Sequence, residues 1–461
     1  MSDKQKAKAT NPFTGETLSE HDFISKEDLE KKIQESWNVF LKFKKSDPKE
    51  RAQKLKKLGE IIERDSDKYA KIITMEMGKP IKEARREVEY AINECKFFGG
   101  HLEEFMKPEE IKTKAKRSYV SIEPLGPIYH VTPFNFPFWL LFRGTVAAMA
   151  MGNTVINKNP QTCPQCGIAA EEAFKEAGFT NGEFMNLIIS QDQSEDIIKN
   201  PSIRGVSFTG STEGGVKVAS WAGQYCKKSV MELGGNDPFI VLKDADMDLA
   251  IEQGVQGRLL NGGQCCTAAK RFIVDESIYE EFKNRLIEKV KDVKVGDPMD
   301  ENTQVGPLAK KSGLEKAMDQ VKKAKEAGAK VLLGGDQPKD EKLKKGHYMN
   351  PTILETSENN PVFDEETFGP IFNLIKFKTE EDALRIANKT KYGLGGAIFT
   401  RDEERAQELG RDLEVGALFI NNMVDWNAST PEGGVKMSGY GREGGKQGAH
   451  EFVNVKTVWI A

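Results

Sequence analysis

The sequence is poor in cysteine and carries almost no net charge. It has 6 cysteines among 461 residues, too few for a disulfide framework, so we expect a reducing compartment. Its 67 basic residues are nearly balanced by 71 acidic ones, which gives a formal net charge of −4. Nucleic-acid-binding proteins usually have a basic excess, so we expect no nucleic-acid partner.

Long hydrophobic runs and a targeting segment are also missing. The longest apolar candidate, Pro137–Val146, is interrupted by Arg143, so we expect no membrane-spanning segment. The first ten residues, MSDKQKAKAT, have neither the apolar core of a signal peptide nor the arginines of a transit peptide. No internal repeat or low-complexity tract is visible. These observations predict a soluble protein of the cytoplasm.

The length of the chain predicts two or three domains. Apolar residues recur at helical spacing between residues 25 and 105, for example at Leu29, Ile33, Trp37 and Phe40. The next segment, residues 112–123, is charged and alternating, which is typical of an extended strand.

From residue 124 onwards the pattern indicates alternating strands and helices. Short apolar runs of strand length occur at residues 126–132, 153–158, 183–189 and 204–209. Helical patterns follow them at residues 138–151, 166–177, 194–199 and 213–222. This rhythm predicts an α/β fold with a parallel, doubly wound sheet. The alternation restarts after Glu232 and continues to about Asn422, which predicts a second α/β domain, and the tail 451–460 alternates like a strand.

The stretch most suggestive of chemistry is Asn261–Arg271, NGGQCCTAAKR, with adjacent thiols at Cys265 and Cys266. Glycines allow close backbone approaches, so a cysteine presented here could attack a carbonyl carbon if it became a thiolate. The alternative is a buried pair of small hydrophobic residues. A carboxylate in Met231–Gly235 (MELGG) and an amide in Pro133–Pro137 (PFNFP) favour the catalytic interpretation.

These three stretches, in this order, resemble the NAD(P)-dependent aldehyde dehydrogenase superfamily. The resemblance runs from Asn11 to the C-terminal tail and is strongest to the shorter bacterial succinate-semialdehyde dehydrogenases, through ELGG-x-DPFIV and AAKRFI. It implies a Rossmann-like NAD(P)-binding domain over 1–105 and 124–233, a catalytic domain over 234–437, and a small β oligomerisation element over 106–123 and 438–461. A homodimer or homotetramer is expected.

The resemblance also implies the catalytic roles. Cys266 fits the family pattern Gly-Gln-x-Cys and would attack the aldehyde, while Asn135 and the Cys266 backbone N–H would stabilise the oxyanion. Glu232 would activate the water that hydrolyses the thioester, best if burial raises its pKa. The neighbouring Cys265 is either an inert spacer or a thiol that oxidises reversibly and blocks Cys266.

The cofactor positions follow from the same resemblance. Lys158 would bond the adenosine ribose, and Gln161 stands where NAD-preferring relatives often carry a glutamate, so both NAD and NADP are expected. The remaining positions that match cofactor contacts are Gly210, Ser211, Gly215, Glu366 and Phe368. Backbone amides at the helix start in Phe208–Gly215 favour a phosphate, although a plain strand–helix turn would look the same. Cys163 and Cys166 form half a metal motif without a second pair, so no metal is expected.

Arg143 is the candidate that selects the substrate. It matches the arginine with which semialdehyde dehydrogenases bind the far carboxylate of the substrate, and we expect it on the same helix as Asn135. A structural ion pair is the alternative, because a buried guanidinium needs an anionic partner. Two positions depart from the family: Leu260 replaces the usual second anchor, and Glu432 replaces an aromatic residue.

The predicted reaction is therefore the oxidation of an aldehyde to an acid, with succinic semialdehyde the favoured substrate and another short or medium aldehyde the alternative. A cofactor-independent thioester hydrolase or acyltransferase could also use Cys266 and Glu232. The third alternative is a non-enzymatic scaffold, which would tolerate the loss of either residue.

Overall fold

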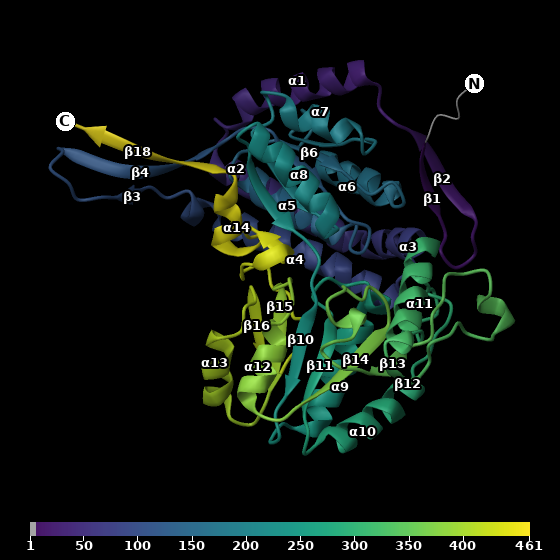
Figure 1. The fold of residues 1–461 in the computed structure, drawn as a ribbon. Coiled ribbons are helices and arrows are strands. Elements are labelled where there is room, and N and C mark those ends of the chain that lie inside the picture. The colour runs from purple at the N-terminus through teal and green to yellow at the C-terminus, as the bar shows by residue number, and fades with distance from the viewer. Residues whose placement is uncertain (1–5) are drawn as a thin grey trace.

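The computed structural model describes residues 6–461 and consists of two α/β lobes with a projecting β arm (Figure 1). A hairpin of β1 (Lys6–Thr10) and β2 (Thr17–Asp22) begins the chain. Four helices follow, which are α1 (Lys26–Phe43), α2 (Pro48–Arg64), α3 (Ser66–Met77) and α4 (Ile81–Phe105). The hairpin was not predicted from the sequence, but helices between residues 25 and 105 were.

Local sequence signals explain where these helices begin. Ser25 accepts a hydrogen bond from the backbone N–H of Asp28 ahead of α1, and Asp47 accepts one from Lys49 ahead of α2. Pro48 occupies the first position of α2, where its missing N–H costs nothing.

The first lobe contains a six-stranded sheet in the order β17-β9-β8-β5-β6-β7. Its parallel strands are β5 (Ile128–Val131), β6 (Val155–Lys158), β7 (Phe184–Asn186), β8 (Gly205–Thr209) and β9 (Lys228–Glu232). The chain runs from β5 outward to β7, then returns to β8 on the other side. This is the strand order of a dinucleotide-binding fold, whose ligands bind where the order reverses.

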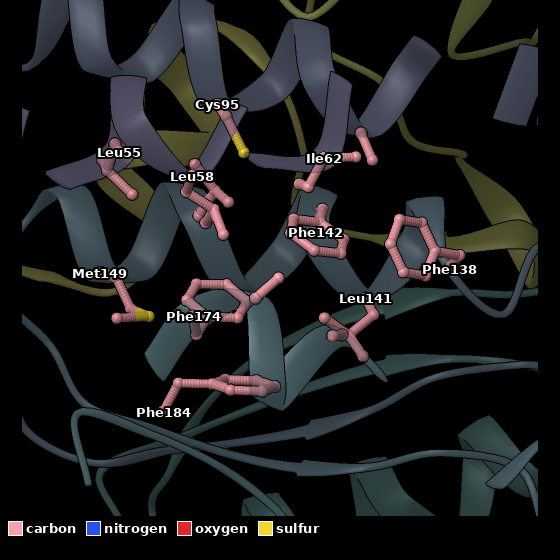
Figure 2. Packing of buried hydrophobic residues seen from close by; sticks show 14 of the residues in the cluster. Leu55, Leu58, Ile62, Cys95, Phe138, Leu141, Phe142, Met149, Phe174 and Phe184 are labelled. Carbon is pink, nitrogen blue, oxygen red and sulfur yellow. The ribbon is translucent and has the colours of Figure 1, made fainter. Parts of the chain in front are cut away.

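Five helices and a short edge strand complete this lobe. They are α5 (Trp139–Ala150), α6 (Pro164–Glu176), α7 (Gln193–Lys199), α8 (Thr212–Gln224), α14 (Gly445–Glu451) and β17 (Gly439–Tyr440). Helix α5 is buried on nearly every side, and its Phe142 ring stacks on Phe174 of α6 at 5.3 Å (Figure 2). Phe174 stacks in turn on Phe184 at 4.3 Å, so the helix rests on a continuous aromatic core.

The second lobe is built on a seven-stranded sheet in the order β12-β13-β14-β11-β10-β15-β16. Its strands are β10 (Asp237–Val241), β11 (Ala269–Asp275), β12 (Lys330–Leu333), β13 (Thr352–Glu355), β14 (Ile371–Phe377), β15 (Gly395–Phe399) and β16 (Ala417–Ile420). All neighbouring pairs except β12 and β13 are parallel. The helices are α9 (Met247–Leu259), α10 (Tyr279–Lys291), α11 (Lys311–Glu326), α12 (Glu380–Asn388) and α13 (Glu403–Arg411), with short 3₁₀ turns η1 (Leu260–Gly263), η2 (Glu341–Leu343), η3 (Pro361–Phe363) and η4 (Lys436–Ser438).

The arm is a three-stranded antiparallel sheet that leaves the body of the molecule (Figure 1). It consists of β3 (Glu109–Glu110), β4 (Arg117–Pro124) and β18 (Val453–Ile460), and β18 pairs with β4 along its whole length. The predicted strands at residues 112–123 and 451–460 therefore pair with each other. The α/β class with parallel sheets is confirmed.

Several further findings concern the described residues. No helix between residues 6 and 461 is long and apolar enough to cross a membrane. Within the same range, no cluster of three or more histidine, cysteine, aspartate or glutamate side chains could hold a metal ion. All six cysteines are free thiols.

Candidate active site

A cavity of about 280 Å³ lies between the two lobes and brings several of the predicted residues together. Cys266, Glu232 and Arg143 all line it. The remaining wall mixes aromatic, aliphatic and polar residues, and includes Phe136, Trp139, Phe419, Asp425, Trp426 and Glu432. A mostly apolar cavity with a few convergent polar groups is the usual form of a small-molecule site.

The backbone before the two thiols is folded into an unusual turn. Asn261, Gly262 and Gly263 have φ values of 56°, 61° and 76°. A side chain at Gly263 would lie 2.2 Å from the carbonyl oxygen of Gly369, so only glycine fits. The turn buries Cys265 completely and leaves Cys266 partly exposed in the cavity wall. This difference in exposure supports Cys266 as the nucleophile.

Asn261 ties this turn to the rest of the site, a role that the sequence did not reveal. Its side-chain amide donates to the carbonyl oxygens of Asn135 at 2.7 Å and Gln264 at 3.2 Å. Its backbone N–H donates to the Glu83 carboxylate of α4 at 2.8 Å. The turn is therefore fixed against both the Pro133–Pro137 segment and the N-terminal helices.

Asn135 lies ahead of α5, which begins at Trp139, so the expectation that Asn135 and Arg143 share one helix was wrong. Two prolines flank the short segment that holds Asn135, which explains why the helix starts later. The side-chain amide of Asn135 has no hydrogen-bond partner among residues 6–461, and the residue is buried. An unused donor is what an oxyanion site requires.

The two neighbouring thiols influence each other's ionisation. Contact with Cys265 and burial raise the pKa of Cys266 well above its usual value. The Lys270 ammonium works in the opposite direction, since it lies at 3.0 Å from the Cys265 carbonyl oxygen. A raised pKa means that the Cys266 thiol must lose its proton before it can attack.

Glu232, at the carboxyl end of β9, is a buried carboxylate in the wall of the same cavity. Burial raises the pKa of Glu232 well above its usual value, and its Oε1 atom has no hydrogen-bond partner in the described chain. A side chain at Gly433 would approach this oxygen to 2.7 Å, so the glycine keeps room for the carboxylate. A buried carboxylate with a free oxygen can exchange protons with a thiol or a water molecule.

Arg143 enters the cavity wall from α5, where it is paired. Its Nη1 donates to Glu432 at 2.6 Å and its Nε donates to Glu443 at 2.7 Å. The Arg143 side chain is only 6% exposed. The structural ion pair that the sequence left open is therefore present. Leu260, at the position of the second anchor, is partly buried against the core of the second lobe.

Lys158 ends β6 at the edge of the first sheet where a cofactor would bind. It is 7% exposed, and its ammonium has neither an ion-pair nor a hydrogen-bond partner among residues 6–461. Burial and the neighbouring Lys310 lower the pKa of Lys158 to about 8. A buried cation without an acceptor fits a ligand hydroxyl or phosphate. Gln161 lies in the turn after this strand, partly exposed.

The start of α8 provides backbone donors beside the same edge. Ser211 caps the helix by accepting a hydrogen bond from the Gly214 N–H, and Gly210 donates its own N–H to the Glu232 carbonyl oxygen at 3.0 Å. A side chain at Gly215 would come within 2.1 Å of Leu233, so close packing requires the glycine. The helix start favours a negatively charged group, as expected of a pyrophosphate site.

Glu366 and Phe368 approach from the second lobe. The Glu366 carboxylate accepts a hydrogen bond from the Gly235 N–H at 3.1 Å and lies 3.7 Å from the Lys270 ammonium. The Phe368 ring meets Phe134 edge to face at 6.0 Å. These contacts connect the two lobes beside the turn at residues 261–263.

Comparison with known proteins agrees with this geometry. The model of the aldehyde dehydrogenase family matches residues 1–458. The chain belongs to the aldehyde dehydrogenase family. The resemblance inferred from the sequence is thereby confirmed.

Individual members of the family are similar along almost their whole length. A probable succinate-semialdehyde dehydrogenase (NADP(+)) of Synechocystis is 40% identical over 455 residues, 98% of this chain and 99% of that protein. A succinate semialdehyde dehydrogenase (NAD(P)+) of Escherichia coli is 38% identical, over 97% of this chain and 96% of that protein. The crystal structure of succinic semialdehyde dehydrogenase from Streptococcus pyogenes with NADP+ superposes with a TM-score of 0.95 at 36% identity, covering 98% of this chain and 99% of that one.

Proposed function

We propose that this protein oxidises succinic semialdehyde to succinate with NAD(P)+. The observation that carries the proposal is the shared cavity of Cys266 and Glu232, a thiol and a buried carboxylate beside a cofactor-binding sheet edge. The substrate follows from the relatives, since those of Synechocystis, Escherichia coli and Streptococcus pyogenes are named for this aldehyde.

Cys266 and Glu232 supply the covalent chemistry. The Cys266 thiol releases its proton to solvent, its sulfur bonds to the aldehyde carbon, and the former carbonyl oxygen becomes an oxyanion. The Asn135 amide and the Cys266 N–H donate to that oxyanion. Bound NAD(P)+ supplies the hydride acceptor that turns the adduct into a thioester. Glu232 then takes a proton from water, which attacks the thioester and releases the acid and the Cys266 thiol.

The residues at the edge of the first sheet fit such a cofactor. The Lys158 ammonium is buried without an acceptor, and the N-terminus of α8 at Ser211 favours phosphate oxygens. Gln161 is neutral, so it does not repel a 2′-phosphate, and we expect both NAD and NADP to bind. Glu366 and Phe368 would contact the nicotinamide ribose from the second lobe.

An assembly of two or four chains is part of the proposal. The arm strand β18 exposes apolar side chains, with Val455 60% and Trp459 51% exposed. A flat strand with exposed apolar residues favours pairing with another chain. The low cysteine content supports a reducing compartment such as the cytoplasm.

An aldehyde panel assayed with each cofactor tests the proposal. We expect reduction of NAD and of NADP with succinic semialdehyde, and a smaller kcat/KM with uncharged aldehydes such as butanal. Activity confined to uncharged aldehydes would refute succinic semialdehyde as the substrate, but it would still agree with aldehyde oxidation as the reaction. Hydrolysis of a thioester without any cofactor reduction would favour the hydrolase instead.

A further inference from the structure

The carboxylate-binding arginine of this cavity is paired with a glutamate of its own chain. Arg143 Nη1 donates to Glu432 Oε2 at 2.6 Å, in the wall that also contains Cys266. The Nη2 group of Arg143 has no acceptor among residues 6–461. A substrate carboxylate that approaches this guanidinium therefore meets a carboxylate already bound to it.

Glu443 and Glu432 are not equivalent partners of Arg143. Glu443 also accepts a hydrogen bond from the Ser207 hydroxyl at 2.8 Å, and its side chain is 5% exposed. Glu432 has no partner other than Arg143 for its carboxylate in the described chain, and its side chain is 18% exposed. Glu443 is thus fixed inside the protein, whereas Glu432 faces the cavity.

The backbone holds the two glutamates side by side. Each donates its N–H to the carbonyl oxygen of the other, at 2.7 Å from Glu432 and 2.8 Å from Glu443. This bridge fixes where the Glu432 side chain begins, but its carboxylate can still turn away from Arg143. One guanidinium with two carboxylates carries a net negative charge, which repels a third carboxylate.

We propose that Glu432 is a specificity-determining residue that competes with the substrate carboxylate for Arg143. Binding of a semialdehyde displaces Glu432 from Arg143, and binding of an uncharged aldehyde does not. The inference rests on the proposed function, because it concerns the aldehyde site of that reaction. It predicts that this chain discriminates less strongly in favour of carboxylate-bearing aldehydes than an enzyme with a free arginine.

The protonation state of Glu432 supports the same competition. Burial raises the pKa of Glu432 to about 7, against the opposing charge of Arg143. For Glu443, burial acts in the same direction, but Arg143 and His130 hold its pKa below the usual value. The charged or titratable groups that surround Glu432 are Arg143 from α5, Glu94 from α4, Glu232 from β9, Glu443, Cys265 and Asp425.

The direction of the pH effect follows from these groups. Below a pH of about 7 the Glu432 carboxyl group is increasingly protonated and releases Arg143 for the substrate. Above that pH its charge competes with the substrate carboxylate, which stays ionised throughout. The chemical steps that need Glu232 and the thiols are common to both aldehydes, so the effect of their titration on those steps cancels in a ratio of two substrates.

The test compares the ratio of kcat/KM for succinic semialdehyde to kcat/KM for butanal. In the unmodified enzyme we expect this ratio to fall as the pH rises through about 7. In Glu432→Gln the ratio rises about tenfold at alkaline pH, as a charge-assisted hydrogen bond to Arg143 becomes available. The gain should fall mainly on KM for succinic semialdehyde, and the ratio should depend less on pH than in the unmodified enzyme.

Asp425→Asn is the matched control, because it removes one negative charge from the same cavity without a bond to Arg143. We expect it to change the ratio far less than Glu432→Gln. A flat pH profile in the unmodified enzyme, an equal loss on both aldehydes in Glu432→Gln, or an equal gain in Asp425→Asn would overturn the inference.

These outcomes are separate from failure of the proposed function. If the unmodified enzyme oxidises butanal but not succinic semialdehyde, the proposed substrate is wrong. In that case the inference requires Glu432→Gln to gain activity on succinic semialdehyde. If this variant gains none, the proposed competition between Glu432 and the substrate carboxylate for Arg143 is refuted as well.

Discussion

At the scale of single residues, Cys265 and Cys266 differ in exposure rather than in chemical type. Only Cys266 lines the cavity. We therefore predict that Cys266→Ser abolishes NAD(P)H formation, whereas Cys265→Ser retains at least about a tenth of the activity, since its thiol touches no substrate. Steady-state assays of both variants at saturating aldehyde measure this. Activity in Cys266→Ser together with none in Cys265→Ser would reverse the assignment.

Glu232 gives a second prediction at this scale. Glu232→Gln should still produce a burst of NAD(P)H, with slow turnover afterwards, because the thioester lacks the base that activates water. Burial raises the pKa of Glu232, so in the unmodified enzyme the deacylation rate should increase as the pH rises through that raised value. Stopped-flow absorbance at several pH values separates the two phases. A folded variant without a burst would assign Glu232 to the attack step instead.

The sequence predicted these residue types but not all of their partners. Gly-Gln-x-Cys and MELGG identify Cys266 and Glu232 because the motifs are local. The contact between Arg143 and Glu432 joins positions far apart in the chain, and nothing in the spacing of either stretch indicates it. Asn261 was missed for the same reason, since its role depends on hydrogen bonds to Asn135 and Glu83.

At the scale of elements, α5 is the helix on which the site depends, and a buried glutamate fixes its beginning. Glu87 of α4 accepts hydrogen bonds from the N–H groups of Phe138 at 2.9 Å and Trp139 at 3.1 Å. It also pairs with Lys79 at 2.5 Å, and both side chains are fully buried. The pair therefore connects α4 to the segment that carries Asn135.

Glu87→Ala should lower the free energy of unfolding by about 3–5 kcal/mol, because Lys79 is left as an unpaired charge in the core. Urea-induced unfolding measures the change. Glu63→Ala is the control, since its pair with Lys96 is exposed and should contribute less than about 1 kcal/mol. Equal effects of the two substitutions would mean that the buried pair contributes no more than a surface one.

The elements themselves were largely predictable, since apolar periodicity decides where strands and helices form. The helical pattern at residues 138–151 agrees with α5 (Trp139–Ala150) to within one residue at each end. Only the placing of Asn135 on that helix was wrong, because the residue before Pro137 is kept out of the helical conformation. The edge strand β17, formed by Gly439 and Tyr440 beside β9, could not be predicted either. A two-residue strand has no periodicity to detect, and only its partner defines it.

At the scale of the whole molecule, the arm is the feature that a single chain leaves unexplained. It projects away from both lobes (Figure 1). Its last strand exposes Val455, Trp459 and Ile460. Exposed apolar area of this kind is costly in water unless another surface covers it. A second copy of the chain is the partner that every molecule of this protein has available.

We predict that Trp459→Asp, with Val455→Asp added if needed, converts the assembly into smaller species, because a desolvated carboxylate opposes burial of the arm. Sedimentation velocity at several protein concentrations measures the change. Leu41→Asp is the control, since Leu41 of α1 is 40% exposed and lies outside the arm. The lobes should keep their fold, so circular dichroism should match the unmodified protein. If both arm substitutions leave the sedimentation coefficient unchanged, the arm does not hold the chains together, and the contact must be sought on the surface of the lobes.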